Sequence, residues 1–273
     1  MSTPSGHAPL VWFTSLAIAG AGIMAAASRH SDIGQAAQWD ALAAGAVALG
    51  AGLLISTLHL GQWARAPLAL RGAGRSALSH EVLLAGAALA SGVGLLAMSA
   101  RHAVDVRIGL AVVAINVLFL LSIGNVYRVR GQRTWGGATA LLPLTTGLVC
   151  GETFVIAIGG TLVPDASAVW RTVSIDAMVF ALGWQTWART AWPSARRPIA
   201  VRRGHVLSLM RLLLFNVAPV VCLAVRWPAV AMVPVAIGLV LDRCLFYAAA
   251  DQHTTEAELS SVEALIGRDA RID

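Results

Sequence analysis

The chain has 273 residues, of which 57% are hydrophobic and only 12% are charged, and its mean hydropathy is +0.72. A soluble domain of this size carries more charge, so the composition excludes a soluble globular protein and predicts an integral membrane protein. The formal net charge is +6, and every one of the 20 basic residues is arginine. We expect membrane lipid, and no nucleic acid, among the partners of the chain.

Apolar stretches long enough to cross a membrane follow one another along most of the chain. A hydrocarbon core of about 30 Å needs roughly 20 apolar residues per helical crossing. The stretches lack the alternation of a β-barrel, so helices are the way to satisfy their backbone in lipid. We predict an all-α fold, an integral membrane bundle of eight transmembrane helices over residues 1–250, followed by a polar tail over 251–273. The predicted spans lie near residues 10–28, 41–61, 81–100, 107–127, 137–160, 170–188, 206–225 and 229–249.

The arginines are unevenly distributed between the two predicted membrane faces. Eight crossings place the N-terminus, the tail and the second, fourth and sixth connections on one face, which we call the first face. An excess of basic residues predicts a cytoplasmic first face. The alternative is a periplasmic face that docks an acidic partner, because guanidinium groups suit carboxylates at interfaces. The first-face connections contain Arg65, Arg71, Arg75, Arg128, Arg130, Arg133, Arg189, Arg196, Arg197, Arg202 and Arg203, and the opposite ones Arg29, Arg101, Arg107, Arg171 and Arg226.

The stretch "STLHLGQWARAPLALRGAGRSALSHE", residues 56–81, brings polar chemistry to the first face. His59 lies about one turn from the end of the second span, and Glu81 opens the third, so a helical hairpin places both at the same face. An imidazole and a carboxylate can exchange the protons that accompany quinone redox chemistry. The pair therefore predicts a quinone site. The alternative is that both residues anchor and cap helices, since a carboxylate is favoured near a helix N-terminus.

Four further residues have candidate roles near this site. Arg65 is a second candidate to hydrogen-bond a quinone carbonyl, with a lipid-phosphate contact as the alternative. Ser79 is a predicted N-cap of the third span. Arg243 and Tyr247 lie four residues apart on one helical face near the first face, which places them as further lining of the same pocket.

Other ionisable or amide groups fall deeper in the predicted spans, where they are costly unless paired. Arginines among them offer partners that neutralise the carboxylates, so ion pairs between helices are the prediction. The alternatives are a secondary transporter with a midplane site of Glu152, Asp176 and Arg211, and an inert structural tether. The deeper residues are Asn116, Glu152, Asp176, Arg211, Asn216, Asp242 and Arg243.

Metal and haem ligands are not expected in this chain. Cys150, Cys222 and Cys244 stand singly within predicted spans, without the paired spacing of a zinc or iron–sulfur site. The histidines fall at span ends or in connections, whereas bis-histidine haem anchors need imidazoles facing one another within helices. We predict no haem and no iron–sulfur cluster.

Four segments of the sequence resemble the dimethyl sulfoxide reductase membrane-anchor (DmsC-like) family, which is related to polysulfide-reductase-type quinone anchors. They are "STLHLGQWARAPLAL", "SALSHEVLL", "NVYRVRGQRTW" and "DRCLFY". The resemblance implies a haem-free anchor in the bacterial inner membrane that binds menaquinone or ubiquinone. It also implies docking to a four-cluster iron–sulfur subunit, which serves a molybdopterin catalytic subunit. The anchor itself is then not catalytic for the substrate.

Carried over to this sequence, the resemblance implies that His59 and Glu81 bind quinol and transfer protons, with Arg65 secondary. Where family members often have Pro or Ser after the HLG motif, this chain has Gln62 and Trp63. Dimethyl sulfoxide reductase docks on the periplasmic side, and a related sulfite dehydrogenase docks on the cytoplasmic side, which fits the arginine distribution better. The arginines expected to dock the partner are Arg71, Arg75, Arg128, Arg130 and Arg133.

Overall fold

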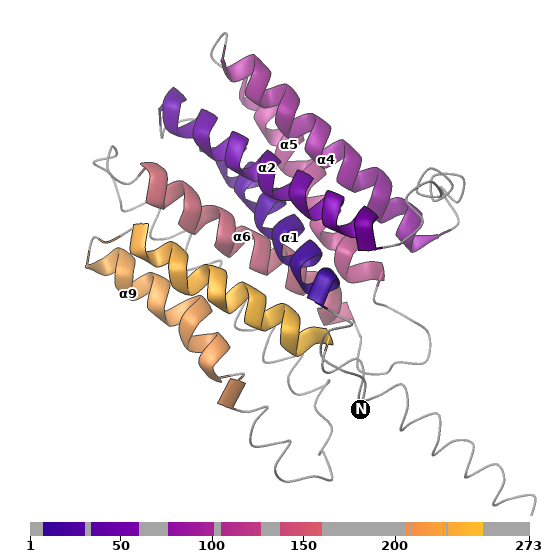
Figure 1. The fold of residues 1–273 in the computed structure, drawn as a ribbon. Coiled ribbons are helices and arrows are strands. Elements are labelled where there is room, and N and C mark those ends of the chain that lie inside the picture. Colours follow the sequence, from indigo (N-terminus) through magenta and orange to yellow (C-terminus); the bar gives the residue numbers. More distant parts are fainter. Residues whose placement is uncertain are drawn as a thin grey trace, which may run out of the picture.

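The computed structural model describes residues 8–30, 34–59, 76–100, 105–126, 137–159, 206–207, 209–225, 227 and 229–247. All regular secondary structure in these residues is helical (Figure 1). Six of the described helices are long and apolar enough to cross a membrane. They are Ala8–Arg29 (α1), Gln35–His59 (α2), Ala77–Ser99 (α4), Val106–Val126 (α5), Gly137–Gly159 (α6) and Ala229–Tyr247, which we call the last described helix.

The all-α prediction is confirmed for the described residues, but eight crossings are not established. The first five predicted spans and the eighth correspond to the six long helices. The seventh is represented by a shorter apolar helix, Leu209–Leu223, which contains a π-helical turn at Leu213–Val217 (η4) and continues into Ala218–Ala224 (α9). The predicted sixth span, 170–188, and the predicted tail, 251–273, lie outside the described residues.

Helix α1 lies at the centre of the bundle. It packs against α2, α5 and α6, and every residue from 20 to 28 is buried, so all sides of that half of the helix are covered (Figure 1). Hydrophobicity alone does not require this position, because an apolar helix in a membrane can face either lipid or protein. Its sequence there, "GAGIMAAAS", supplies mostly small side chains, which allow several neighbours to approach closely.

Glycines bring α1 and α6 into backbone contact. A Cβ atom built on Gly22 would lie 1.8 Å from the carbonyl oxygen of Gly147, and one on Gly151 would lie 2.1 Å from the carbonyl oxygen of Gly22. Gly147 and Gly151 are four residues apart, the spacing that lets two membrane helices pack with their backbones touching. The two helices therefore depend on glycine at these positions.

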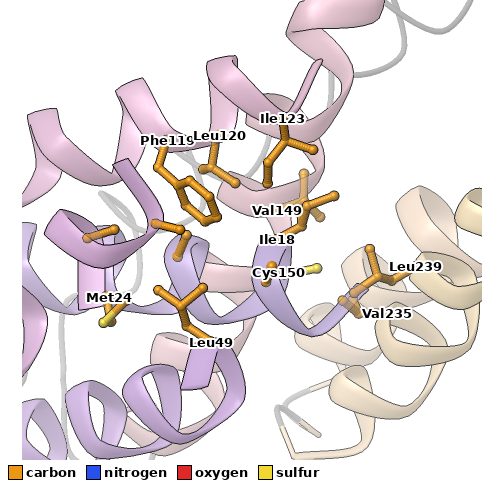
Figure 2. Packing of buried hydrophobic residues seen from close by; sticks show 14 of the residues in the cluster. Ile18, Met24, Leu49, Phe119, Leu120, Ile123, Val149, Cys150, Val235 and Leu239 are labelled. Carbon is orange, nitrogen blue, oxygen red and sulfur yellow. The ribbon is translucent and has the colours of Figure 1, made fainter. Parts of the chain in front are cut away.

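The apolar core extends from these helices to the last described helix. Ile18 of α1 and Phe119 of α5 pack in one cluster with Val149 and Cys150 of α6, and Cys150 faces Leu239 of the last described helix (Figure 2). Cys150 is thus buried, whereas Cys222 is partly exposed and Cys244 is exposed.

The described helices expose large apolar side chains and bury several charged ones. Val47 on α2 is 71% exposed, Leu110 on α5 57% and Ile237 on the last described helix 51%. Arg211 and Arg243, in contrast, are among the largest fully buried side chains. This distribution is the reverse of a soluble protein and fits a bundle whose outer surface contacts lipid.

Candidate functional site

Three hydrogen bonds establish which helix ends share the first face. The side-chain amide of Gln35, at the start of α2, donates to the carbonyl oxygen of Ser99, at the end of α4. This bond lies at the face opposite the first face. Because the two helices are in contact and antiparallel, the end of α2 at His59 and the start of α4 lie together at the first face. The hydroxyl of Tyr247 donates to Thr14 Oγ1, near the start of α1, at 3.5 Å. The side-chain amide of Gln38 donates to the carbonyl oxygen of Ala27, so α1 and α2 form a hairpin and α1 starts at the end of the bundle where α2 finishes. The predicted placement of these helix ends together is therefore confirmed.

Glu81 points into the bundle. It is the fifth residue of α4, its side chain is only 6% exposed, and it continues the one buried stripe of that helix. From Glu81 the buried positions alternate in steps of four and three, which places them on a single helical face. That face is covered chiefly by α2 and α5. The stripe consists of Glu81, Ala85, Ala88, Gly92, Leu95 and Ser99.

The capping role considered for Glu81 is wrong, and so is the predicted N-cap at Ser79. Helix α4 begins after Ser76, whose extended backbone (φ −126°, ψ 133°) marks the N-cap, and its first turn contains no acidic residue. Ser79 lies inside the helix and is buried. The helix starts one turn earlier than predicted, so Glu81 lies beyond the free backbone N–H groups that a cap would bind.

The buried carboxylate of Glu152 is paired at the opposite end of the bundle. Its Oε1 accepts a hydrogen bond from Arg29, the last residue of α1, and its Oε2 lies 2.9 Å from His30 Nε2. The Glu152 side chain is 1% exposed, whereas that of Arg29 is 40% exposed. The arginine thus extends from the membrane surface to neutralise a carboxylate within α6.

The carboxylate of Asp242 is paired between the last two described helices. Its Oδ1 lies 2.6 Å from Arg211 Nε, and its Oδ2 accepts a hydrogen bond from Arg243 Nε at 2.8 Å. All three side chains are almost completely buried. The prediction that internal arginines neutralise buried carboxylates is confirmed for Asp242.

Glu81 differs from both of these residues. Glu81, Glu152 and Asp242 are the buried carboxylates of the described chain. The other two have arginine partners, but no described residue forms an ion pair or hydrogen bond with the Glu81 carboxylate. An ionisable group inside a membrane bundle that has no cationic partner among the described residues is a candidate for proton exchange.

Glu152 and Arg211, the described members of the midplane site in the transporter alternative, do not lie together. Glu152 pairs at the end of α1, and Arg211 pairs with Asp242. Asp176 lies outside the described residues. The two described members of that predicted site therefore belong to separate ion pairs.

Arg243 and Tyr247 lie on another side of the bundle from α4. The Arg243 guanidinium carbon is 5.1 Å from the centre of the Phe246 ring, and Tyr247 packs with Val11 of α1. No described hydrogen bond or ion pair joins either residue to Glu81. The structure thus places all three residues toward the first face but does not bring them into direct contact.

The side chains of the remaining predicted site residues lie outside the described part of the chain. His59 ends α2, but its side chain lies outside the described residues. Arg65 and all five docking arginines lie outside them too. In the described part of the chain, no cluster of three or more histidine, cysteine or acidic side chains is arranged to hold a metal ion.

Two features of the site were missed from the sequence. The buried stripe of α4 could have been found in the sequence, because Glu81 is spaced at helical intervals from the small residues Ala85, Ala88 and Gly92. The pairing of Glu152 with Arg29 could not have been found in the sequence. The two residues are 123 positions apart, and only the packing of α1 on α6 brings them together.

A protein-family model matches the part of the chain that contains α1, α2, α4, α5 and α6. Residues 1–182 match the model described as DMSO reductase anchor subunit (DmsC). The chain belongs to this family. Membership makes it the multi-pass membrane-anchor subunit of a molybdopterin oxidoreductase complex, with catalytic and iron–sulfur partner subunits. Among curated proteins and solved structures, no match was found.

The DmsC match includes the first-face hairpin but not every predicted site residue. His59, Arg65 and Glu81 lie within residues 1–182, whereas Arg243 and Tyr247 lie beyond them. The family match therefore includes the proton-exchange candidates and ends before the last described helix.

Proposed function

We propose that this anchor subunit binds quinone or quinol at the first face. There it exchanges electrons and protons between the membrane quinone pool and a docked iron–sulfur subunit. The complex is of the sulfite dehydrogenase or dimethyl sulfoxide reductase type. The observation that carries the proposal is Glu81, a buried carboxylate at the first-face end of α4 with no cationic partner among the described residues.

His59 and Glu81 have the proton chemistry that this function requires. When quinol is oxidised, its hydroxyl protons need acceptors at the quinone oxygens, and quinone reduction uses the same groups in reverse. Glu81 points inward from α4, and α2 ends at His59 on the same face. We assign proton exchange to this pair and hydrogen bonding of the quinone oxygens to Arg65, Arg243 and Tyr247.

The arginine-rich connections of the first face are proposed to dock the iron–sulfur subunit. Guanidinium groups bind carboxylates in a planar, bidentate geometry, so a row of them selects an acidic partner surface. Their excess over the opposite face supports a cytoplasmic docking side. The residues are Arg71, Arg75, Arg128, Arg130 and Arg133.

The test compares quinone-coupled with dye-coupled turnover in the assembled complex. His59→Ala and Glu81→Gln should each abolish turnover with quinone or quinol, while an artificial dye that exchanges electrons directly with the soluble subunits should still support activity. Glu152→Gln is the matched control, because it neutralises a buried acid at the other end of the bundle. Loss of both activities, or of neither, in the His59 and Glu81 variants would contradict the proposal.

A further inference from the structure

Asp242 connects two arginines across a helix interface. Each carboxylate oxygen binds one arginine. Oδ1 forms an ion pair with Arg211 of the Leu209–Leu223 helix, and Oδ2 accepts hydrogen bonds from both Nε and Nη2 of Arg243. Two N–H groups on one oxygen fix the direction of the Arg243 guanidinium more strictly than a single bond would. Asp242, the neighbour of Arg243 in sequence, is therefore one of the groups that fix the guanidinium.

The ion pair with Arg211 depends on a close helix contact one turn away. A Cβ atom on Gly238 would lie 3.0 Å from the Cβ of Phe215, which belongs to the π-helical turn η4. Asp242 follows Gly238 by four residues, and Arg211 precedes Phe215 by four, so the antiparallel helices bring the two charges together. The close approach at Gly238 and the Arg211–Asp242 pair therefore lie in the same helix interface, one turn apart.

The same chain of contacts continues to the first face. The Arg243 guanidinium stacks over Phe246, and the Phe246 and Tyr247 rings meet edge to face with centres 5.3 Å apart. The Tyr247 hydroxyl reaches Thr14, whose own hydroxyl donates to the carbonyl oxygen of Leu10 at 2.8 Å. Asp242 is therefore the inner end of a connected series of groups that ends at the start of α1.

We propose that Asp242 is a positioning residue for the quinone site. By holding the Arg243 guanidinium on its own Oδ2, Asp242 sets the direction in which Arg243 presents its remaining N–H donors to a quinone oxygen. Through Phe246 it also sets the position of the Tyr247 ring, whose hydroxyl exchanges its long hydrogen bond to Thr14 for the quinone oxygen. The inference rests on the proposed quinone function. It assigns a role to Asp242 and Arg211, which make no contact with the quinone themselves.

Donors of this kind suit quinone chemistry for a physical reason. A quinone oxygen gains negative charge as electrons arrive, and preorganised guanidinium and phenol donors stabilise that charge without having to rearrange. A long arginine side chain loses rotamer freedom when it binds. Asp242 removes that freedom before the quinone arrives, so it lowers the concentration of quinone needed for half-maximal turnover.

The experiment measures quinol or quinone kinetics of the whole complex in Asp242→Asn, Asp242→Glu and Tyr247→Phe variants. The matched control is Glu152→Gln, which breaks the other buried arginine–carboxylate cluster. We expect Asp242→Asn to raise KM for quinone at least about tenfold with a smaller change in kcat, because a hydrogen bond to a charged group contributes that factor or more. Asp242→Glu keeps the charge and should recover part of the affinity.

Tyr247→Phe removes one hydroxyl and should also raise KM, and its effect should not add fully to that of Asp242→Asn, since both act on one group of donors. If Asp242→Asn does not assemble, the KM values of Asp242→Glu and Tyr247→Phe decide the question. An unchanged KM in those variants, or equal KM changes in Asp242→Asn and Glu152→Gln, would overturn the positioning role alone. Unaltered quinone kinetics in Glu81→Gln and His59→Ala as well would overturn both this role and the proposed function.

Discussion

Replacing Gly22 by alanine tests the backbone contact between α1 and α6. The added Cβ would lie 1.8 Å from the Gly147 carbonyl oxygen, and real Cβ atoms essentially never come within 3.0 Å of such a neighbour. The helices must therefore separate by about one ångström, which forfeits up to about half of the dispersion energy of each contact along the interface. Overpacking of this kind costs about 3 kcal/mol, and the helical preference of alanine over glycine offsets about 1 kcal/mol of that.

The assay is the thermal stability of the detergent-solubilised complex, followed by size-exclusion chromatography after heating. A net loss of about 2 kcal/mol should lower Tm by about 4–8 °C for a chain of this size. Gly86→Ala is the matched control, because a Cβ on Gly86 meets nothing within 4 Å. That variant should be unchanged or slightly more stable. Equal Tm values for the two alanine variants would refute the contact as a determinant of packing.

Three further changes separate structural from chemical roles. Glu152→Gln should lower the stability of the solubilised complex by about 2 kcal/mol and leave quinone kinetics unchanged, because it removes the partner of Arg29, whose partial exposure reduces the loss. Glu81→Gln should show the opposite pattern, with stability within about 1 kcal/mol of the parent and quinone turnover lost, since no described cation loses a partner. A large fall in Tm would show that Glu81 is structural. Gly238→Leu should separate the last described helix from Phe215 and raise KM for quinone. Gly94→Leu, at a position with open space, should leave KM unchanged. Equal KM values would argue against coupling through the Gly238–Phe215 contact.

The helical spans were predictable because hydrophobic length is a local property. The first predicted span, 10–28, differs from α1 at Ala8–Arg29 by only a residue or two at each end. The eighth, 229–249, agrees similarly with the helix observed at Ala229–Tyr247. The seventh was predicted as an ordinary crossing, and nothing in its hydropathy indicates the π-helical turn at Leu213–Val217. Phe215 of that turn packs closely against Gly238 of the last described helix, a contact that a hydropathy profile does not contain.

The candidate site was predictable only where residues are close in sequence. His59 and Glu81 flank one connection, so the hairpin alone places them at one face. The start of α4 was misplaced by one turn because "SALSHE" offers two serines as caps, and the backbone selects Ser76. The Arg29–Glu152 pair arises from the arrangement of helices distant in the chain, which spacing cannot reveal.

The central position of α1 has a consequence for biogenesis. Helix α1 is synthesised more than a hundred residues before α6, yet Gly22 lies against Gly147 and Gly151. At ordinary rates of translation, on the order of ten seconds pass between the emergence of the two helices. During that interval the small-residue face of α1 has no α6 to cover it. Membrane insertion of this subunit therefore leaves an early helix dependent on a late one, and a chain interrupted before α6 would expose that face to lipid or to quality-control proteases.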